Sequence, residues 1–207
     1  KIQLNSLYGA MANQYFRFYD DRIAEGITMS GQLVIRDTAK ALDAYMNKVC
    51  GTDDEMYSFY SDTDSCYVTC KNLVDNFFPN KDTDKIVGLL DKIATDKIEP
   101  AIAQAMTKLG NYTNAFEHKI DFKREVIADK GVFVAKKRYA LNVLDDEGLR
   151  LKEPKLKVMG LEIVRSSTPG PIRESLKEAV RLILTSDEEN LQKFIEQAKA
   201  DFKTKSP

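Results

Sequence analysis

The sequence predicts an α+β fold, and two observations indicate this class. Apolar residues repeat at helical spacing over residues 22–49, over 83–109 and after residue 168. Residues 56–70 and 115–151 instead have the alternating pattern of β-strands. The 207 residues include 43% apolar and 30% charged side chains, which is the composition of a globular protein with a sizeable core.

Composition also excludes several classes of protein. The net charge is -1, so any nucleic-acid surface must come from local clusters of basic residues. No apolar run approaches the roughly 20 residues of a membrane span, and no signal peptide opens the chain. Cys50, Cys66 and Cys70 lack CxxC spacing, which indicates a reducing compartment and no zinc site. The only histidine, His118, is expected at the surface, so His-based catalysis is excluded.

The first fifty residues predict two helices joined by an aromatic link. Residues 1–13 have the pattern of a helix end, and the next six are expected to be extended. Their aromatic side chains are expected to pack against the fold, although such residues can also stack on bases. Asp20 or Asp21 is expected to cap a helix over about 22–49, and Gly51 to end it. The residues expected on its inner side are Ile23, Ile27, Leu33 and Val34.

Hairpins and further helices follow. Residues 56–70 predict a β-hairpin with a polar centre, and the helix over 83–109 is expected to kink at Pro100. A turn is expected at residues 129–131, flanked by strand segments at 132–134 and 139–143.

Two helices are expected near the end of the chain. The first begins behind Pro169 and Pro171, and the second opens with a capping box from Ser186 to Glu189. The second helix is expected to carry one apolar stripe, formed by Leu191, Phe194, Ile195, Ala198 and Phe202.

Paired carboxylates mark the first hairpin. Residues 51–67 hold five acidic residues and no basic one, and Asp62 and Asp64 stand two apart. On extended backbone such side chains point to the same side, where each carboxylate raises the pKa of the other unless a cation lies between them. Mg²⁺ suits this role because it binds one or two carboxylates together with substrate phosphates. The alternative is a solvated turn, in which Asp and Thr are ordinary residues.

One face of the opening helix collects polar residues. Lys1, Asn5, Tyr8 and Ala12 fall within about 60° of one another at 100° per residue. A cation, an amide and a phenol beside small residues suit a nucleotide, because Lys can meet a phosphate as a point charge. Spacing alone nevertheless favours a solvated polar face.

Two later segments are locally basic. Residues 119–138 contain seven basic and three acidic residues, and residues 149–165 contain five basic and two acidic ones. Excesses of four and three positive charges on neighbouring strands are typical of a phosphate-binding surface. Charged strands that simply face water are the alternative.

Taken together, these segments resemble the family B DNA polymerases, most closely those of T-even-type bacteriophages. Residues 1–9 match the KxxxNSxYG pattern of the fingers helix, and residues 60–65 match the YxDTDS palm hairpin. Residues 136–139 match the KKRY element, while 159–162 and 166–169 resemble the stretch that leads into the thumb. The motifs occur in the family's order.

The resemblance implies an architecture. Residues 1–14 would be the end of the fingers, and residues 15–154 an antiparallel palm sheet with packed helices. Residues 155–207 would be the start of a truncated helical thumb.

The resemblance also implies the role of each motif residue in nucleotidyl transfer. Asp64 would be a catalytic metal ligand and Asp62 its weaker neighbour, with two Mg²⁺ ions in the complete enzyme. Lys1 would bind the triphosphate of the incoming dNTP, while Asn5 and Tyr8 would line the nascent base pair. The residues that would hold the primer strand are Lys136, Lys137, Arg138 and Tyr139.

Other family parts are not found in the sequence, namely the second metal-binding Asp in a DxxSLYPS segment, the upstream fingers and the exonuclease domain. The chain starts at Lys1 and stops after an amphipathic helix, so we expect a fragment of a DNA-directed DNA polymerase with little activity alone. The alternatives are a subunit of a split polymerase, a noncatalytic primer–template binding module, or a metal-binding domain without a DNA role. Expected partners are primer–template DNA, dNTPs, the missing N-terminal part and a sliding clamp, in the cytoplasm of a host cell and without a membrane.

Overall fold

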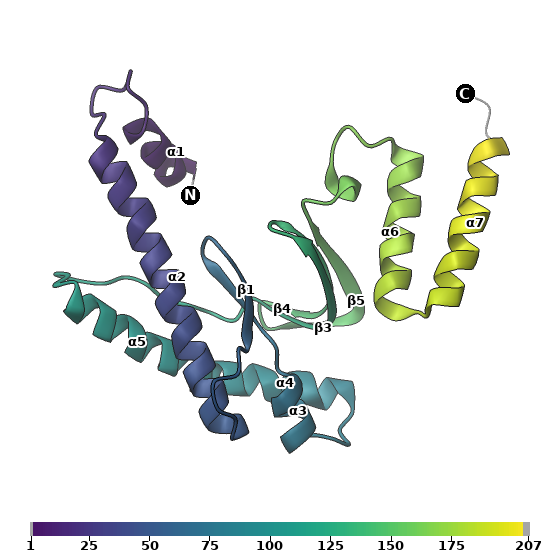
Figure 1. Cartoon of the computed structure of the whole chain (residues 1–207), viewed down its shortest axis with the longest axis horizontal. Helices are drawn as coiled ribbons and strands as arrows, with labels where there is room; N and C mark the ends of the chain where they lie inside the picture. The colour runs from purple at the N-terminus through teal and green to yellow at the C-terminus, as the bar shows by residue number, and fades with distance from the viewer. Residues whose placement is uncertain (1, 205–207) are drawn as a thin grey trace. The chain divides into compact units, whose positions relative to one another are not determined.

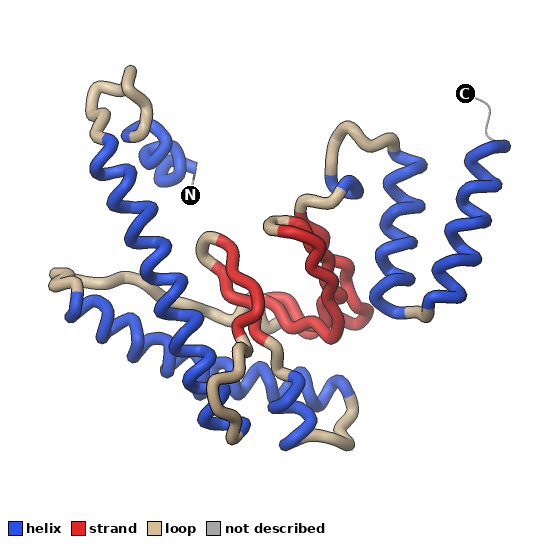
Figure 2. The backbone as a smooth tube through the Cα atoms, in the orientation of Figure 1, coloured by secondary structure: helices blue, strands red, loops and turns tan. Residues whose placement is uncertain are grey.

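The computed structural model describes residues 2–204, and these residues form two compact units. Described residues up to 82 together with 92–123 make the first unit, and 83–91 together with the residues from 124 onward make the second. Helices predominate, and the described residues also form a two-stranded and a three-stranded antiparallel sheet (Figure 2). The predicted α+β class is therefore confirmed.

In the first unit, helix α1 spans Ile2–Met11 and is followed by the aromatic link. The prediction that this link is extended is wrong. The backbone N–H of Phe16 donates to the Asn13 carbonyl at 2.9 Å, and the Tyr15 N–H donates to Asn13 Oδ1 at 3.0 Å. Asn side chains stabilise turns in this way, so the link folds into successive turns. Tyr15 is 89% and Phe18 67% exposed, so the prediction that these two rings pack against the fold is also wrong.

Helix α2 spans Asp21–Cys50 and has the predicted ends. Asp20 is the N-cap, and its carboxylate accepts from the backbone N–H of Arg22 at 3.0 Å. Gly51 ends the helix with φ 68°, and its N–H donates to the Asn47 carbonyl. This left-handed backbone conformation favours glycine, because glycine lacks the Cβ that makes the conformation costly for other residues.

The predicted inner side of α2 is wrong for Ile23, Ile27 and Leu33, which are between 39% and 49% exposed. The buried residues of α2 are Ala24, Thr38, Leu42 and Met46. From Val34 onward the inward positions recur every four residues, where α5 packs against the C-terminal half of α2 (Figure 1). The apolar residues nearer the start of α2 lie outside this contact, so tertiary packing decides which residues are buried.

The predicted first hairpin is confirmed. Strands β1 (Ser58–Asp62) and β2 (Ser65–Val68) pair antiparallel, and helix α3 (Lys71–Phe77) follows them. Cys66 and Val68 of β2 pack against a buried cluster that α2 and α5 contribute. The members of this cluster are Leu42, Ile102, Met106 and Leu109. The hairpin is therefore anchored on the helical core of the first unit.

The helical stretch around Pro100 is interrupted just before the proline. Helix α4 (Thr83–Ile93) leads into a π-helical turn, Ala94–Ile98, and helix α5 (Glu99–Tyr112) follows. The N–H of Glu99 donates to the Ala94 carbonyl, five residues back. Pro100 then lies in the first turn of α5, where its missing N–H costs no hydrogen bond.

The second unit contains strands β3 (Val126–Ala135), β4 (Arg138–Asp146) and β5 (Leu149–Met159) in the order β3-β4-β5. The central strand β4 is buried from residue 139 to 145. Its two buried polar side chains are paired: Asn142 donates to Asp129 at 2.8 Å, and Asp145 accepts from Arg124 at 2.5 Å. Buried polar groups need such partners, so these bonds help to set the register.

The predicted turn at residues 129–131 is wrong. Ala135 pairs with Arg138, so the turn between β3 and β4 is formed by Lys136 and Lys137, and Lys137 has φ 61°. Gly131 instead lies inside β3, where an added Cβ would come within 2.6 Å of Leu141 Cδ2. A side chain at this position would force the end of the Leu141 side chain to move, so Gly131 allows the close contact between the two strands.

We expect Gly131→Ala to destabilise the chain by about 2 kcal/mol, because the new methyl group overpacks the buried Leu141. Gly88→Ala is the matched control in the same unit. Gly88 lies in α4 with no atom within 4 Å of an added Cβ, so this change should stabilise by about 0.5–1 kcal/mol. Urea unfolding followed by circular dichroism measures both, and a Gly131→Ala chain as stable as the parent would contradict the packing argument.

Helices α6 (Gly170–Thr185) and α7 (Glu188–Thr204) complete the second unit, after a short 3-10 turn at Glu162–Val164. Helix α6 packs on β3 and β4, and α7 packs on α6 (Figure 1). The predicted capping box is wrong by one residue, because Asp187 rather than Ser186 accepts from the N–H of Asn190, at 2.9 Å. In the described part of the chain no helix is long and apolar enough to cross a bilayer.

The apolar stripe predicted for α7 is only partly covered. Leu191, Phe194 and Ala198 are half-buried, whereas Ile195 is 38% and Phe202 64% exposed.

Candidate functional site

The two predicted catalytic carboxylates lie at the tip of the β1–β2 hairpin. Asp62 ends β1 and pairs with Ser65, so Thr63 and Asp64 form a two-residue turn. The expectation that both acids lie on extended backbone is therefore wrong for Asp64. Its N–H donates to the Asp62 carbonyl at 2.6 Å, and the Thr63 hydroxyl donates to Asp62 Oδ1 at 3.0 Å. These hydrogen bonds thus stabilise the turn that carries the two acids.

The backbone of this tip is strained. Thr63 has φ 52°, which is rare for a β-branched residue because its side chain crowds the left-handed conformation. Such strain persists only where the surroundings determine the conformation, and it is concentrated at functional sites. The Ser65 hydroxyl donates to the Asp62 carbonyl at 3.1 Å and so helps to hold the turn in this conformation.

Asp43 of α2 holds the other end of β1. Its Oδ1 accepts from the backbone N–H groups of Tyr57 and Ser58, at 3.0 and 2.7 Å, and its Oδ2 accepts from the Ser58 hydroxyl at 2.8 Å. Tyr57 is fully buried and Ser58 is 8% exposed, so these donors have little access to water. Sequence reasoning missed Asp43, and the available signal was one carboxylate within an otherwise apolar and small-residue stretch of α2.

The hairpin tip carries two side chains of the type that binds hard cations. Asp62 is half-buried and Asp64 is exposed, and both offer the carboxylate oxygens that Mg²⁺ prefers. Within residues 2–204 no group of three or more His, Cys, Asp or Glu side chains is arranged to hold a metal ion. The oxygen donors of Asp62 and Asp64 fit the ligand preference of Mg²⁺, but two carboxylates do not complete a coordination sphere.

The predicted nucleotide-binding residues belong to the opening helix. Lys1 lies outside the described residues. Asn5 lies in α1, where only its backbone is described, and Tyr8 lies in the same helix with 38% of its surface exposed. The structure thus places Asn5 and Tyr8 three residues apart on one helix of the first unit.

The KKRY residues lie at the β3–β4 turn of the second unit. Lys136 and Lys137 are exposed at the turn, and Arg138 begins β4. Tyr139 is only 5% exposed, and its ring stacks on Phe133 with centroids 5.2 Å apart. The buried ring of Tyr139 therefore anchors the turn on the sheet. The three basic residues that precede it are more exposed than Tyr139.

The segment that follows β5 packs closely against this turn. Gly160 has φ 62°, and an added Cβ there would lie 2.0 Å from the Lys137 carbonyl oxygen. Arg138 Nη2 donates to both carboxylate oxygens of Glu162, at 2.8 and 2.9 Å. The backbone N–H of Glu162 itself, followed by Arg138 and Arg165, lowers the pKa of this carboxyl. Sequence reasoning missed this ion pair, whose partners are 24 residues apart.

The remaining reactive side chains have structural surroundings. Burial raises the pKa of the Cys70 thiol to about 11, and it also raises the pKa of Cys66, so both thiols stay protonated at neutral pH. His118 is exposed, as predicted, and its Nε2 lies 3.4 Å from the Thr107 hydroxyl.

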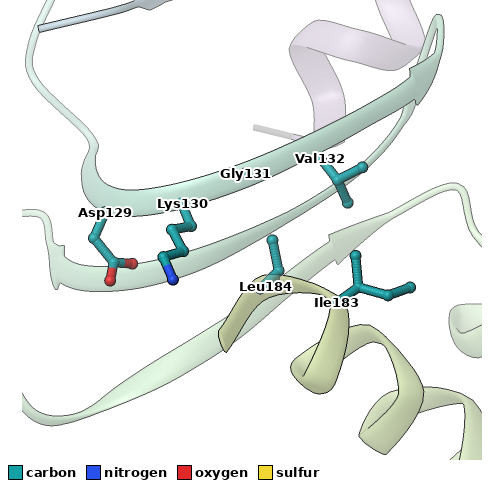
Figure 3. Close-up of a pocket in the computed structure, with 6 residues that line it drawn as sticks. All are labelled: Asp129, Lys130, Gly131, Val132, Ile183 and Leu184. Atoms are coloured by element: carbon teal, nitrogen blue, oxygen red, sulfur yellow. The ribbon is translucent and has the colours of Figure 1, made fainter. Parts of the chain in front are cut away.

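An open, shallow pocket of about 500 Å³ lies between β3 and the end of α6 (Figure 3). Its lining residues are Asp129, Lys130, Gly131, Val132, Ile183 and Leu184. Among the described residues, the predicted site residues do not contribute to this lining.

Comparison with known proteins agrees with the motifs. Residues 1–77 match the model of DNA polymerase family B, and residues 56–198 match that of the divergent family B DNA polymerases. The DNA-directed DNA polymerase of Escherichia phage RB69 is 43% identical over 198 residues, covering 91% of this chain and 22% of the relative.

The DNA-directed DNA polymerase of Enterobacteria phage T4 is 40% identical over 213 residues, covering 98% of this chain and 24% of the relative. A DNA polymerase of Methanocaldococcus jannaschii is 26% identical over 97% of this chain. The chain spans less than a quarter of the length of both phage relatives.

Proposed function

The chain belongs to DNA polymerase family B, and from this we propose that it is the part of a DNA-directed DNA polymerase that bears the palm hairpin. Residues 1–14 would end the fingers, 15–154 would form the palm, and 155–207 would begin the thumb. The observation that carries the proposal is the β1–β2 hairpin, with Asp62 closing its first strand and Asp64 in its turn. This is where the YxDTDS pattern lies.

Asp62 and Asp64 are assigned as the catalytic, metal-binding carboxylates of this chain. Bound Mg²⁺ ions would activate the primer 3′-hydroxyl and neutralise charge on the leaving pyrophosphate. The hairpin contributes by keeping both acids at one tip, supported by the hydrogen bonds around Asp62 and by the anchoring of β2 on the helical core. The principal role is assigned to Asp64 from its place in the YxDTDS pattern, and its exposed position in the turn leaves the carboxylate accessible to a cation.

The opening helix is assigned to the incoming dNTP. Lys1 would bind its triphosphate, and Asn5 and Tyr8 would line the nascent base pair. The support is that Asn5 and Tyr8 share helix α1 and that part of Tyr8 is exposed. A phenol ring on a helix surface can contact a base or a sugar face.

The β3–β4 turn is assigned to the primer strand. Lys136 and Lys137 are exposed there, and Arg138 follows them on β4. Arg can form paired hydrogen bonds with a phosphate, whereas Lys acts as a point charge. Tyr139 would act by holding the turn, since its ring is buried against Phe133.

By itself the chain is expected to show little nucleotide addition. The described residues provide no third carboxylate beside the hairpin pair, whereas two metal ions need further ligands. The same observation favours a second function for the isolated chain, namely primer–template binding without synthesis, as a fragment or as a subunit of a split polymerase. Contact with a sliding clamp remains a prediction.

Primer extension with and without the missing N-terminal part tests the proposal. Extension by the completed enzyme, together with binding but no extension by the chain alone, is the expected result. A completed enzyme that binds primer–template but never extends it would favour the noncatalytic function. Extension by the chain alone would contradict the need for further metal ligands.

A prediction on DNA binding tests the basic turn. Lys136→Ala with Lys137→Ala should weaken primer–template binding and lower the slope of log affinity against log salt by about two, one for each lost phosphate contact. Lys177→Ala with Lys193→Ala, on α6 and α7, is the matched control and should leave the slope unchanged. Fluorescence anisotropy at several salt concentrations measures it, and an unchanged slope for the turn variant would exclude this DNA surface.

A further inference from the structure

The guanidinium of Arg138 is held from one side by a single carboxylate. Both bonds to Glu162 leave from Nη2, at 2.8 and 2.9 Å, and the Nη2 of Arg165 lies 3.9 Å from the same carboxylate. Arg138 Nε is buried and has no hydrogen-bond partner within the described part of the chain. A guanidinium carries five N–H donors in a planar fork. Glu162 occupies those of Nη2 and the fold covers Nε, so the two N–H groups of Nη1 remain for a further acceptor.

The backbone of Glu162 is in turn held by the residues that follow it in the chain. The Thr168 hydroxyl donates to the Glu162 carbonyl at 2.7 Å, and Arg173 Nη2 on α6 donates to the Thr168 carbonyl at 2.9 Å. Gly160, against the Lys137 carbonyl, brings the same segment up to the β3–β4 turn. Hydrogen bonds therefore connect the first turns of α6 to the backbone of Glu162, and the side chain of Glu162 binds Arg138.

We propose that Glu162 is a positioning residue, which holds the Arg138 guanidinium in the orientation that binds a phosphate of primer–template DNA. This role rests on the proposed function of the β3–β4 turn, and in it Glu162 orients Arg138 before DNA binds. An Arg side chain left unpaired loses rotamer freedom when it binds, whereas one already oriented loses less. Glu162 acts through Arg138 and touches no DNA.

The opposite role would be a carboxylate that competes with phosphate for Arg138. Two features favour positioning. The backbone carbonyl of Glu162 is bound by the Thr168 hydroxyl, which limits where the half-exposed carboxylate can lie. Arg138, Arg165 and Glu162 together retain one positive charge, so their field still attracts DNA. The two roles predict changes in affinity of opposite sign.

Two conservative variants of the full chain separate these roles. Glu162→Asp keeps the charge but is one methylene too short to reach Arg138, and Glu162→Gln loses the charge but keeps an oxygen that can accept from Arg138. We expect Glu162→Asp to weaken binding to a short primer–template duplex about fivefold, and Glu162→Gln to stay within about twofold of the parent. Glu174→Asp is the matched control, because Glu174 pairs with Lys177 on α6 at 2.8 Å and should leave affinity unchanged.

A double-mutant comparison completes the test. Arg138→Ala should weaken binding about tenfold and lower the salt slope by about one, and adding Glu162→Asp should cause no further loss. Higher affinity for either Glu162 variant, unchanged affinity for Glu162→Asp, or a Glu162→Asp loss that persists without Arg138 would overturn the positioning role. Parental affinity for Arg138→Ala would overturn the DNA-binding assignment of Arg138 as well.

Discussion

Replacing Asp64 by Asn in the completed polymerase should slow primer extension about a thousandfold, the largest effect that we expect from any single change in this chain. The amide has nearly the same size but carries no charge, so it binds a hard divalent cation weakly. Asp64 lies exposed in the hairpin turn, and the change should leave the pairing of β1 with β2 intact. Single-turnover extension with Mg²⁺ and dNTP measures the rate.

Two related variants make this result specific. Asp62→Asn should slow extension less, by about tenfold to a hundredfold, because Asp62 is assigned the weaker role and already accepts from the Thr63 hydroxyl. Asp54→Asn is the matched control: Asp54 is a nearby exposed acid at φ 59°, a conformation that Asn tolerates well. Equal extension rates for the parent and Asp64→Asn would reject Asp64 as an essential ligand, whatever the DNA affinity.

Local chemistry made much of the fold predictable. The ends of α2 follow from Asp20 and Gly51, whose cap and left-handed conformation act within a few residues. The first hairpin follows from aromatic and β-branched arms around a polar centre. The inner side of α2 was not predictable in the same way, because α5, which is distant in the sequence, decides which part of α2 is covered.

The misplaced turn has a similar cause. Residues 129–131 have good turn chemistry, yet Gly131 makes room for Leu141 on the neighbouring strand. Lys136 and Lys137 carry no turn signal, but Lys137 adopts φ 61° because the paired strands end there. The long ladder of β3 with β4 thus prevails over local preference.

In the candidate site, the motif residues were predictable from the sequence and the residues that support them were not. The motif residues at the two hairpin turns could be found in the sequence, since their types and spacing carry the resemblance. Their supports could not. Asp43 binds backbone N–H groups fourteen and fifteen residues away, and Glu162 binds Arg138 across 24 residues, so only the folded chain brings the partners together.

The Asp43 support leads to the largest effect that we expect on stability. Asp43→Ala should destabilise the first unit by about 3 kcal/mol, because the buried N–H groups of Tyr57 and Ser58 and the Ser58 hydroxyl would lose their acceptor together. Asp43→Asn keeps one oxygen for the two N–H groups, so it should cost only about 1 kcal/mol. Glu25→Ala, at an exposed position of the same helix, should change stability by less than about 0.5 kcal/mol.

Hydrogen exchange can show where the loss occurs. The amides of Tyr57 and Ser58 should exchange faster in Asp43→Ala than in the parent, while amides in the second unit keep their protection. Since β1 runs from Ser58 to Asp62, loosening its first residue frees the strand that ends at the proposed catalytic carboxylate, and extension by the completed enzyme should fall even where the variant remains folded. Unchanged exchange at these two amides would show that Asp43 does not hold the strand, and its effect on Asp62 would then have no physical basis.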